Sequence, residues 1–269
     1  MKFSIITVNY NNGIGLHKTI ESVAKQTFKD YEHIIIDGQS TDDSKEIILR
    51  NKDYFSYWCS EPDKGIYNAM NKGITHAYGD YFLFLNSGDV LHDDAVLRCL
   101  SKLNTDADII VGLVKRMDNG EYQFKHSGSM VAQLIKHSIS HQGTLIKKSL
   151  FDTRQYNESL SIVADWQFFL ETILIDNRTF YRTDIIVADM DMSGISNNPN
   201  YSSRLLQERD IVLQNHFPPL VLQGLVDYSK VYYHPLYVHL TDIKEHHSFI
   251  FLVIRRCIQL IYIMLKVFR

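Results

Sequence analysis

The most constraining feature of this sequence is a polar segment at the end of each early strand-like run. Residues 3–8, 33–36 and 81–85 are short, apolar runs typical of buried parallel strands. Polar segments occupy residues 7–10, 37–40, 61–65 and 86–89. In an open α/β sheet, ligands bind in the crevice beyond the carboxyl ends of the strands. We therefore expect the four polar segments to share one binding site.

Helical patterns separate these strand-like runs. Apolar residues recur at helical spacing over residues 16–24 and 66–77, and residues 40–43 resemble a helix start with Ser40 as its cap. Residues 108–114 and 121–125 are predicted as strands around a turn. The alternation predicts an α/β fold with a mostly parallel, Rossmann-like sheet and helices on both faces.

The pattern changes after about residue 130. Residues 131–136, 166–175 and 202–214 are predicted as helices, whereas residues 142–146 and 185–188 are predicted as short strands. We expect a first domain over residues 1–200, divided into two halves, residues 1–100 and 101–200. A helical extension would then cover residues 201–269.

The C-terminal residues 248–269 predict an apolar helix with a basic stripe. Arg255, Gln259, Tyr262, Lys266 and Arg269 recur at steps of three and four and share one helix face. Arginines near the middle oppose a membrane-spanning helix, and the pattern favours a helix lying in the membrane interface. The alternative is a helix that packs on protein.

Composition excludes several classes. A net charge of −3 does not favour general nucleic-acid binding, which needs a basic surface. The three cysteines form neither a metal-binding spacing nor a disulfide framework, so a reducing compartment is expected. The N-terminus runs directly into a strand and does not resemble a signal peptide.

The segment from Asn86 and Ser87 to Asp89 follows a buried strand. A carboxylate at this position can bind Mg²⁺ or Mn²⁺, which take oxygen ligands and share them with phosphates. The simpler interpretation is a turn, because Asn, Ser, Gly and Asp are common turn residues. The segment alone does not decide between the two.

Other candidate residues are ambiguous in the same way. Asp37 at a strand end could accept a hydrogen bond from a ribose or base, or could belong to a turn. Asp63 and Lys64 precede a helix N-terminus, which favours phosphate, although Lys64 could be a solvated charge. His141 could contact a phosphate or a sugar hydroxyl, or could be structural.

Asp165 lies in an otherwise apolar run over residues 160–170. A carboxylate in such surroundings needs a partner, and burial could raise its pKa toward the working pH. Both properties suit a general base. The alternative interpretation makes Asp165 a helix N-cap.

In combination, these segments resemble family 2 glycosyltransferases, which have the GT-A fold. The resemblance covers roughly residues 1–196 and rests on residues 3–11, 36–42, 60–73, 84–89, 140–144 and 164–166. Within the family, the sequence is most similar to enzymes that build bacterial surface polysaccharides.

The resemblance implies a role for each matching residue. Thr7, Asn9, Tyr10 and Asp37 would hold the nucleotide of a nucleoside-diphosphate sugar. Asp63, Lys64, Asn86, Ser87 and His141 would complete that site, Asp89 would bind a divalent metal (Mg or Mn), and Asp165 would be the catalytic base. The family usually has an Asp-x-Asp motif where this chain has Asn86 and Gly88 followed by Asp89.

The implied reaction is a single inverting displacement on the donor sugar. Residues 1–100 would bind the nucleotide sugar and residues 101–200 the acceptor, a hydroxyl group of a lipid-linked glycan. The enzyme would be cytoplasmic and peripheral at the inner face of the membrane, held there by the C-terminal helix. No nucleic-acid partner is expected.

Two other functions remain open at this point. A sugar nucleotidyltransferase would also use acids at strand ends, but it typically has a Gly-rich, basic loop after the first strand, where this chain reads Asn9-Tyr10-Asn11-Asn12-Gly13. A non-catalytic, membrane-associated nucleotide-sugar-binding or assembly subunit is compatible with the departure at Asn86 and Gly88. The donor sugar, base and acceptor do not follow from the sequence.

Overall fold

The computed structural model describes residues 2–122, 129–194 and 198–267 of the chain, and it divides into two compact units. Unit 1 comprises residues 1–128 and 138–216, and unit 2 comprises residues 129–137 and 217–269. The division differs from the predicted boundary at residue 200, because residues 202–216 belong to the first unit and residues 129–137 to the second.

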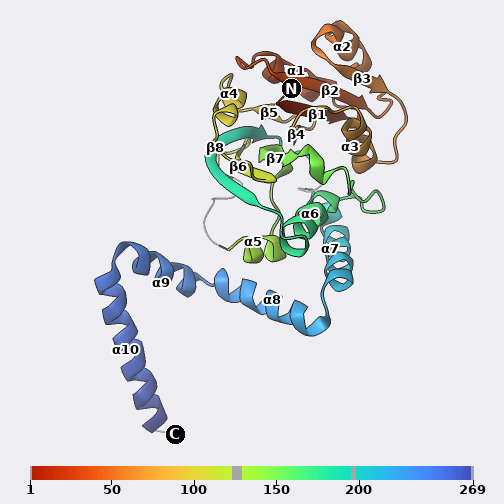
Figure 1. Cartoon of the computed structure of the whole chain (residues 1–269). Helices are drawn as coiled ribbons and strands as arrows, with labels where there is room; N and C mark the ends of the chain where they lie inside the picture. The colour runs from red at the N-terminus through yellow and green to blue at the C-terminus, as the bar shows by residue number, and fades with distance from the viewer. Residues whose placement is uncertain (1, 123–128, 195–197, 268–269) are drawn as a thin grey trace. The chain divides into compact units, whose positions relative to one another are not determined.

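Unit 1 is built on one mixed sheet (Figure 1). Its strands are β1 (Phe3–Asn9), β2 (Tyr31–Asp37), β3 (Tyr57–Ser60), β4 (Tyr81–Phe84), β5 (Val90–Leu91), β6 (Ile109–Arg116), β7 (Thr144–Lys147) and β8 (Phe180–Met190). Within the described residues they are ordered β3-β2-β1-β4-β7-β6-β8-β5. The neighbouring strands β3, β2, β1 and β4 pair in parallel, and so do β6 and β8. Strand β7 pairs antiparallel with β4 and β6, and β5 pairs antiparallel with β8.

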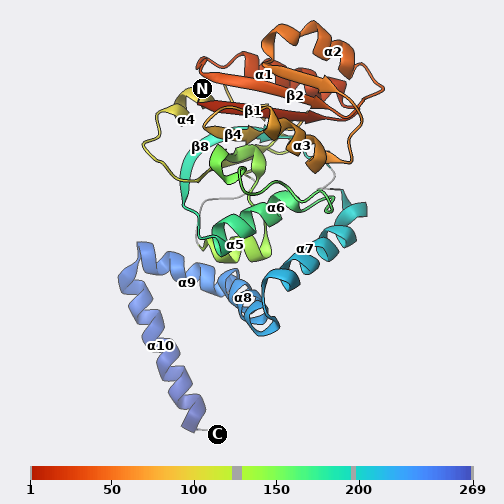
Figure 2. The same cartoon turned by 45° about the vertical axis from the view of Figure 1, so that its right-hand side comes forward.

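The predicted α/β fold is confirmed, with helices on both faces of the sheet (Figure 2). The helices of unit 1 are α1 (Gly13–Ala24), α2 (Ser44–Arg50), α3 (Ile66–Thr75), α4 (Val96–Ser101), α6 (Ala164–Phe169) and α7 (Ser202–His216). Ile35 packs with residues of α1 and α2 on one face. Helix α3 packs against the other face of the sheet. A Cβ added at Gly73 of α3 would lie 2.4 Å from Cγ2 of Ile6 in β1.

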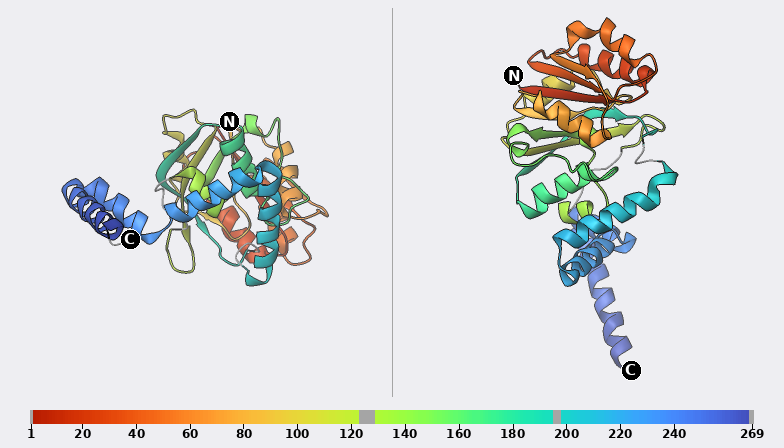
Figure 3. Two further views of the ribbon diagram at one scale, coloured as in Figure 1. Left: turned by 90° about the horizontal axis from the view of Figure 1, so that it is seen from below. Right: turned by 90° about the vertical axis from the view of Figure 1, so that its right-hand side faces the viewer.

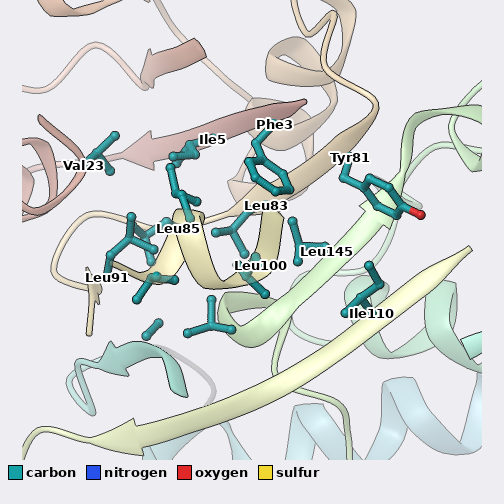
Figure 4. Packing of buried hydrophobic residues seen from close by; sticks show 14 residues of the cluster. Phe3, Ile5, Val23, Tyr81, Leu83, Leu85, Leu91, Leu100, Ile110 and Leu145 are labelled. Atoms are coloured by element: carbon teal, nitrogen blue, oxygen red, sulfur yellow. The ribbon is translucent and has the colours of Figure 1, made fainter. Parts of the chain in front are cut away.

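A large apolar cluster joins the parallel strands to the rest of the sheet (Figure 4). It contains Phe3 and Ile5 from β1, Leu83 from β4, Leu100 from α4 and Leu145 from β7. Full burial of side chains of this size contributes about 1.5–3 kcal/mol each to folding. The cluster holds the strand ends that carry the candidate residues in one rigid sheet.

Two local predictions need revision. Helix α2 begins at Ser44, after Asp43, and Ser40 is not its cap. The Ser40 hydroxyl instead accepts a hydrogen bond from the backbone N–H of Asn11. The strand expected over residues 121–125 lies mostly outside the described residues, although Tyr122 forms an antiparallel bridge with Lys115.

Unit 2 is helical and contains α5 (Met130–Lys136), α8 (Pro219–Tyr232), α9 (Pro235–His246) and α10 (Ser248–Val267) (Figure 3). Helix α5 packs on α8, and the backbone N–H of Ser129 donates to the Tyr232 hydroxyl at 2.8 Å. Lys136 lies over the ring of Tyr233 at 4.8 Å.

Helix α10 is the helix expected over residues 248–269. Arg255 and Arg256 are exposed, and so are apolar side chains such as Phe249, Leu252 and Leu260. Arg269, the last member of the predicted basic stripe, lies outside the described residues. Among the described residues, no helix combines the length and the apolarity needed to span a bilayer.

Candidate active site

The parallel register brings the ends of the early strands together. Asn9 pairs with Asp37 across β1 and β2, and Asp37 pairs with Ser60 across β2 and β3. The Asp37 carboxylate accepts hydrogen bonds from the Asn9 amide at 2.7 Å, the Ser60 hydroxyl at 2.7 Å and the Ser40 backbone N–H at 3.1 Å. A single buried carboxylate therefore ties together the loops that follow three strands.

Two cavities of unit 1 open at this edge of the sheet and share lining residues, among them Tyr10, Asn86 and Ser87. The larger cavity, about 600 Å³, is also lined by Asn9, Gly38 and Asp63. The smaller cavity, about 470 Å³, is lined by Asp89, His141, Asp165 and Asp191.

Three of the predicted binding residues do not line either cavity. Thr7 is completely buried, with its hydroxyl 3.0 Å from Nε2 of His33, a histidine whose pKa burial lowers to about 3. Asp37 is also completely buried and bonded to protein groups. Lys64 is exposed outside the cavities. Thr7 and Asp37 lie beneath the cleft formed by the two cavities and support it. Their side chains are not exposed to a nucleotide bound there.

Asp89 sits in the floor of the smaller cavity. Its side chain is buried, and Oδ1 accepts the backbone N–H of Asp191 at 2.9 Å. Burial raises the pKa of Asp89 to about 6, although the Asp191 N–H and His141 oppose that rise. Gly88 has a φ of 107°, and a Cβ there would lie 2.8 Å from Oδ2 of Asp191. The loop after β4 therefore meets the residue that follows β8.

Asp191 was not among the predicted site residues. It follows the apolar end of β8, which is the same pattern that marked the earlier strand ends. Within the described part of the chain, no cluster of three or more His, Cys, Asp or Glu side chains could hold a metal ion. Asp89 and Asp191 nevertheless present two carboxylates to one cavity.

Asp165 lies in the first turn of α6, whose N-cap is Val163, so the N-cap interpretation is wrong. Its Oδ2 is 2.9 Å from Nδ1 of His141, and its Oδ1 accepts the Tyr67 hydroxyl at 2.9 Å. Burial acts to raise the pKa of Asp165. The hydrogen bond and electrostatic interaction with His141, together with hydrogen bonds from Tyr67 and the Trp166 backbone, outweigh burial and lower this pKa. The expected rise in this pKa is therefore wrong, because the sequence did not show these partners.

The backbone ahead of Asp165 is held from another helix. Glu208 of α7 accepts the backbone N–H groups of Ser161 and Ile162, each at 2.9 Å. Both residues line the smaller cavity. Charge-assisted bonds of this kind are about twice as strong as neutral ones, so α7 helps to set the position of the segment that carries Asp165.

The hydrogen bonds of His141 favour the structural interpretation of this residue over contact with a phosphate or a sugar. Its Nδ1 faces Asp165, and its Nε2 lies 3.1 Å from the amide nitrogen of Asn86. Both ring nitrogens therefore have protein partners, even though the ring lines the smaller cavity. The other amide atom of Asn86, Oδ1, is buried with no hydrogen-bond partner.

Comparison with known proteins shows the family of this chain. The family model described as "Glycosyl transferase family 2" matches residues 4–175. The chain is 31% identical over 208 residues to the uncharacterized glycosyltransferase Rv1514c of Mycobacterium tuberculosis, covering 72% of this chain and 77% of that protein. It is 30% identical over 215 residues to the poly(ribitol-phosphate) beta-N-acetylglucosaminyltransferase TarP of Staphylococcus aureus, covering 72% of this chain and 65% of TarP.

A solved structure shares the fold. Residues 1–349 of S. aureus TarS, in complex with UDP-GlcNAc, superpose with a TM-score of 0.65 and 17% sequence identity, over 91% of this chain and 76% of that chain. At this level of identity, the likeness establishes the fold alone.

The raised pKa of Asp89 predicts a pH-dependent gain in stability for Asp89→Asn. With a pKa of about 6 in the folded state against a usual 3.8, ionised Asp89 destabilises the fold increasingly from pH 4 to 6 and fully above that range. Removing that charge should raise the free energy of unfolding at pH 8 by up to about 3 kcal/mol, with little change at pH 4. Urea denaturation with EDTA present measures this.

The exposed Asp94 provides the control, because Asp94→Asn makes the same chemical change at the surface. An Asp89→Asn variant that is less stable than the wild type at pH 8 would contradict a raised pKa for Asp89.

Proposed function

Since the chain belongs to glycosyl transferase family 2, we propose that it moves a sugar from a nucleoside-diphosphate sugar to a hydroxyl group of a glycan, with inversion at the anomeric carbon. The observation that carries this proposal is the position of Asp165, which lines the same cavity as Asp89 and the residues after β4. A base and a diphosphate site within one cavity suit a direct displacement.

The larger cavity suits the nucleoside of the donor. Asn9, Gly38 and Asp63 line it, and a Cβ on Gly38 would lie 2.4 Å from Oδ2 of Asp63. The glycine therefore keeps the backbone close to this carboxylate and leaves room for a planar base. TarS, which was solved with UDP-GlcNAc, supports a nucleotide-sugar donor for this fold.

The smaller cavity suits the diphosphate and the transferred sugar. Asp89 and Asp191 would hold a divalent cation, because Mg²⁺ is commonly bound through one or two carboxylates together with substrate phosphates. When bound, such an ion supplies positive charge that stabilises the departing diphosphate. Asn86 and Ser87 line this cavity as well.

Asp165 acts on the acceptor. The acceptor oxygen forms a bond to the anomeric carbon while the bond from that carbon to the diphosphate oxygen breaks. Asp165 takes the hydroxyl proton, and the nucleoside diphosphate leaves with the electron pair of the broken bond. The lowered pKa keeps Asp165 ionised at neutral pH and ready to accept the proton.

The acceptor that we propose is a lipid-linked glycan of a bacterial cell surface. TarP is named for transfer to poly(ribitol-phosphate), which supports a polymeric acceptor. The exposed apolar and basic side chains of α10 support an enzyme that binds the inner membrane surface from the cytoplasm. A non-catalytic binding subunit is the alternative, and turnover of any nucleotide sugar would exclude it.

We expect Asp165→Asn to reduce transfer by at least about 10²-fold, because a positioned general base contributes about 10²–10⁴-fold. Binding of the nucleoside diphosphate should be nearly unchanged, since Asp165 acts on the acceptor. Turnover of UDP-, GDP- and dTDP-sugars and isothermal titration with the diphosphates measure the two effects.

Asp152→Asn, at an exposed position outside both cavities, is the matched control and should retain full activity. If Asp165→Asn kept a tenth of the wild-type rate, Asp165 would not be the base.

We also expect the double variant Arg255→Glu/Arg256→Glu to lose binding to vesicles that contain anionic lipid. Each basic residue near such a surface contributes about 1 kcal/mol, so the partition coefficient should fall about 30-fold or more. Vesicle sedimentation measures it.

Lys45→Glu/Arg50→Glu makes the same charge change at exposed positions on α2 and should leave vesicle binding unchanged. Equal binding of the α10 variant and the wild type would rule out the membrane role of this helix.

A further inference from the structure

His141 is held between two side chains rather than presented to a ligand. Nδ1 lies 2.9 Å from Asp165, Nε2 lies 3.1 Å from the Asn86 amide nitrogen, and the side chain is 12% exposed. A histidine that bound phosphate would need one nitrogen directed at the ligand. In this arrangement both nitrogens serve the protein.

The partners of His141 determine which ring nitrogen donates a hydrogen bond and which one accepts. An ionised Asp165 can only accept hydrogen bonds, so Nδ1 must donate to it. The amide nitrogen of Asn86 can only donate, so Nε2 must accept. In the arrangement Asn86–His141–Asp165, Nδ1 therefore donates to Asp165 and Nε2 accepts from Asn86.

This arrangement also orients the Asp165 carboxylate. Tyr67 from α3 donates to one oxygen, and His141 from the short helix η2 (His141–Gly143) donates to the other. A carboxylate has about four lone-pair positions, so acceptor capacity remains toward the cavity. The carboxylate is held from two directions, which fixes where an incoming hydroxyl must lie.

We propose that His141 is a positioning residue for the proposed transfer reaction, which donates from Nδ1 to hold the Asp165 carboxylate in place and to stabilise its negative charge. The role rests on the proposed function of Asp165 as the base. In this role His141 acts through Asp165 and does not contact the nucleotide sugar.

The groups around Asp165 support this role. His141 and Tyr67 lower the pKa of Asp165 against the effect of burial. Arg209 of α7 also interacts with Asp165, and its own pKa, which burial lowers to about 10, leaves it charged at neutral pH. Burial raises the pKa values of Tyr67 and Tyr156 well above 10, so both stay neutral. Loss of the His141 hydrogen bond should therefore raise the pKa of Asp165.

The test is a ¹³C NMR titration of the Asp165 carboxyl group in the 269-residue chain, with the signal assigned from its absence in Asp165→Asn. His141→Phe keeps the volume of the ring but removes the donor. The titration midpoint should rise by about one pH unit. His141→Asn places an amide N–H near the position of Nδ1 and should restore a midpoint close to that of the wild type.

An unchanged midpoint in His141→Phe would overturn the proposal, even if the variant were less stable, because a purely structural role does not alter this titration. If His141→Phe does not fold, His141→Ala provides the same comparison. The titration needs no substrate, so its failure is separate from a failure of the base assignment, which the turnover of Asp165→Asn tests.

Discussion

The site depends on the buried hydrogen bonds of Asp37 at the ends of the parallel strands. The carboxylate joins Asn9 at the end of β1, Ser40 after β2 and Ser60 at the end of β3. Since breaking a buried network of this kind leaves several polar groups unpaired, the loops keep a common arrangement only while Asp37 is in place. Asp37 thus shapes the cleft without entering it.

The second half of the chain contributes the proposed catalytic base and a second carboxylate to this site. Asp165 arrives on α6, and Asp191 follows β8, a strand that lies on the far side of β7 and β6 from β4. The backbone before α6 is held by Glu208, and the carboxylate of Asp165 is held by His141 and Tyr67. Asp165 and the segment before it are therefore supported by hydrogen bonds from separate elements.

Much of the fold could be predicted from the sequence, because the periods of strands and helices are local. The position of Thr7 also follows from a local rule. Side chains alternate along a strand, so Thr7 shares a face with Phe3 and Ile5 and points into the core. A side chain buried in this way does not reach a nucleotide bound in the cleft.

The arrangement around Asp165 could not be predicted in the same way. His141 and Tyr67 lie 24 and 98 positions away in the sequence, and only the tertiary fold brings them to the carboxylate. Without them, burial alone predicts a raised pKa, which is opposite to the net effect. Asp191 could have been found, because an acid at the end of an apolar strand was the pattern that identified Asp89.

A crystal structure of the protein with a nucleoside diphosphate and Mn²⁺ tests the shared cleft most directly. The nucleoside should occupy the cavity beside Gly38 and Asp63, with the diphosphate toward Asp89 and Asp191 and with Asp165 facing the terminal phosphate across open space. A nucleotide bound elsewhere on the molecule, or an Asp165 side chain closed off from the diphosphate, would contradict the assignment of this cleft as the active site.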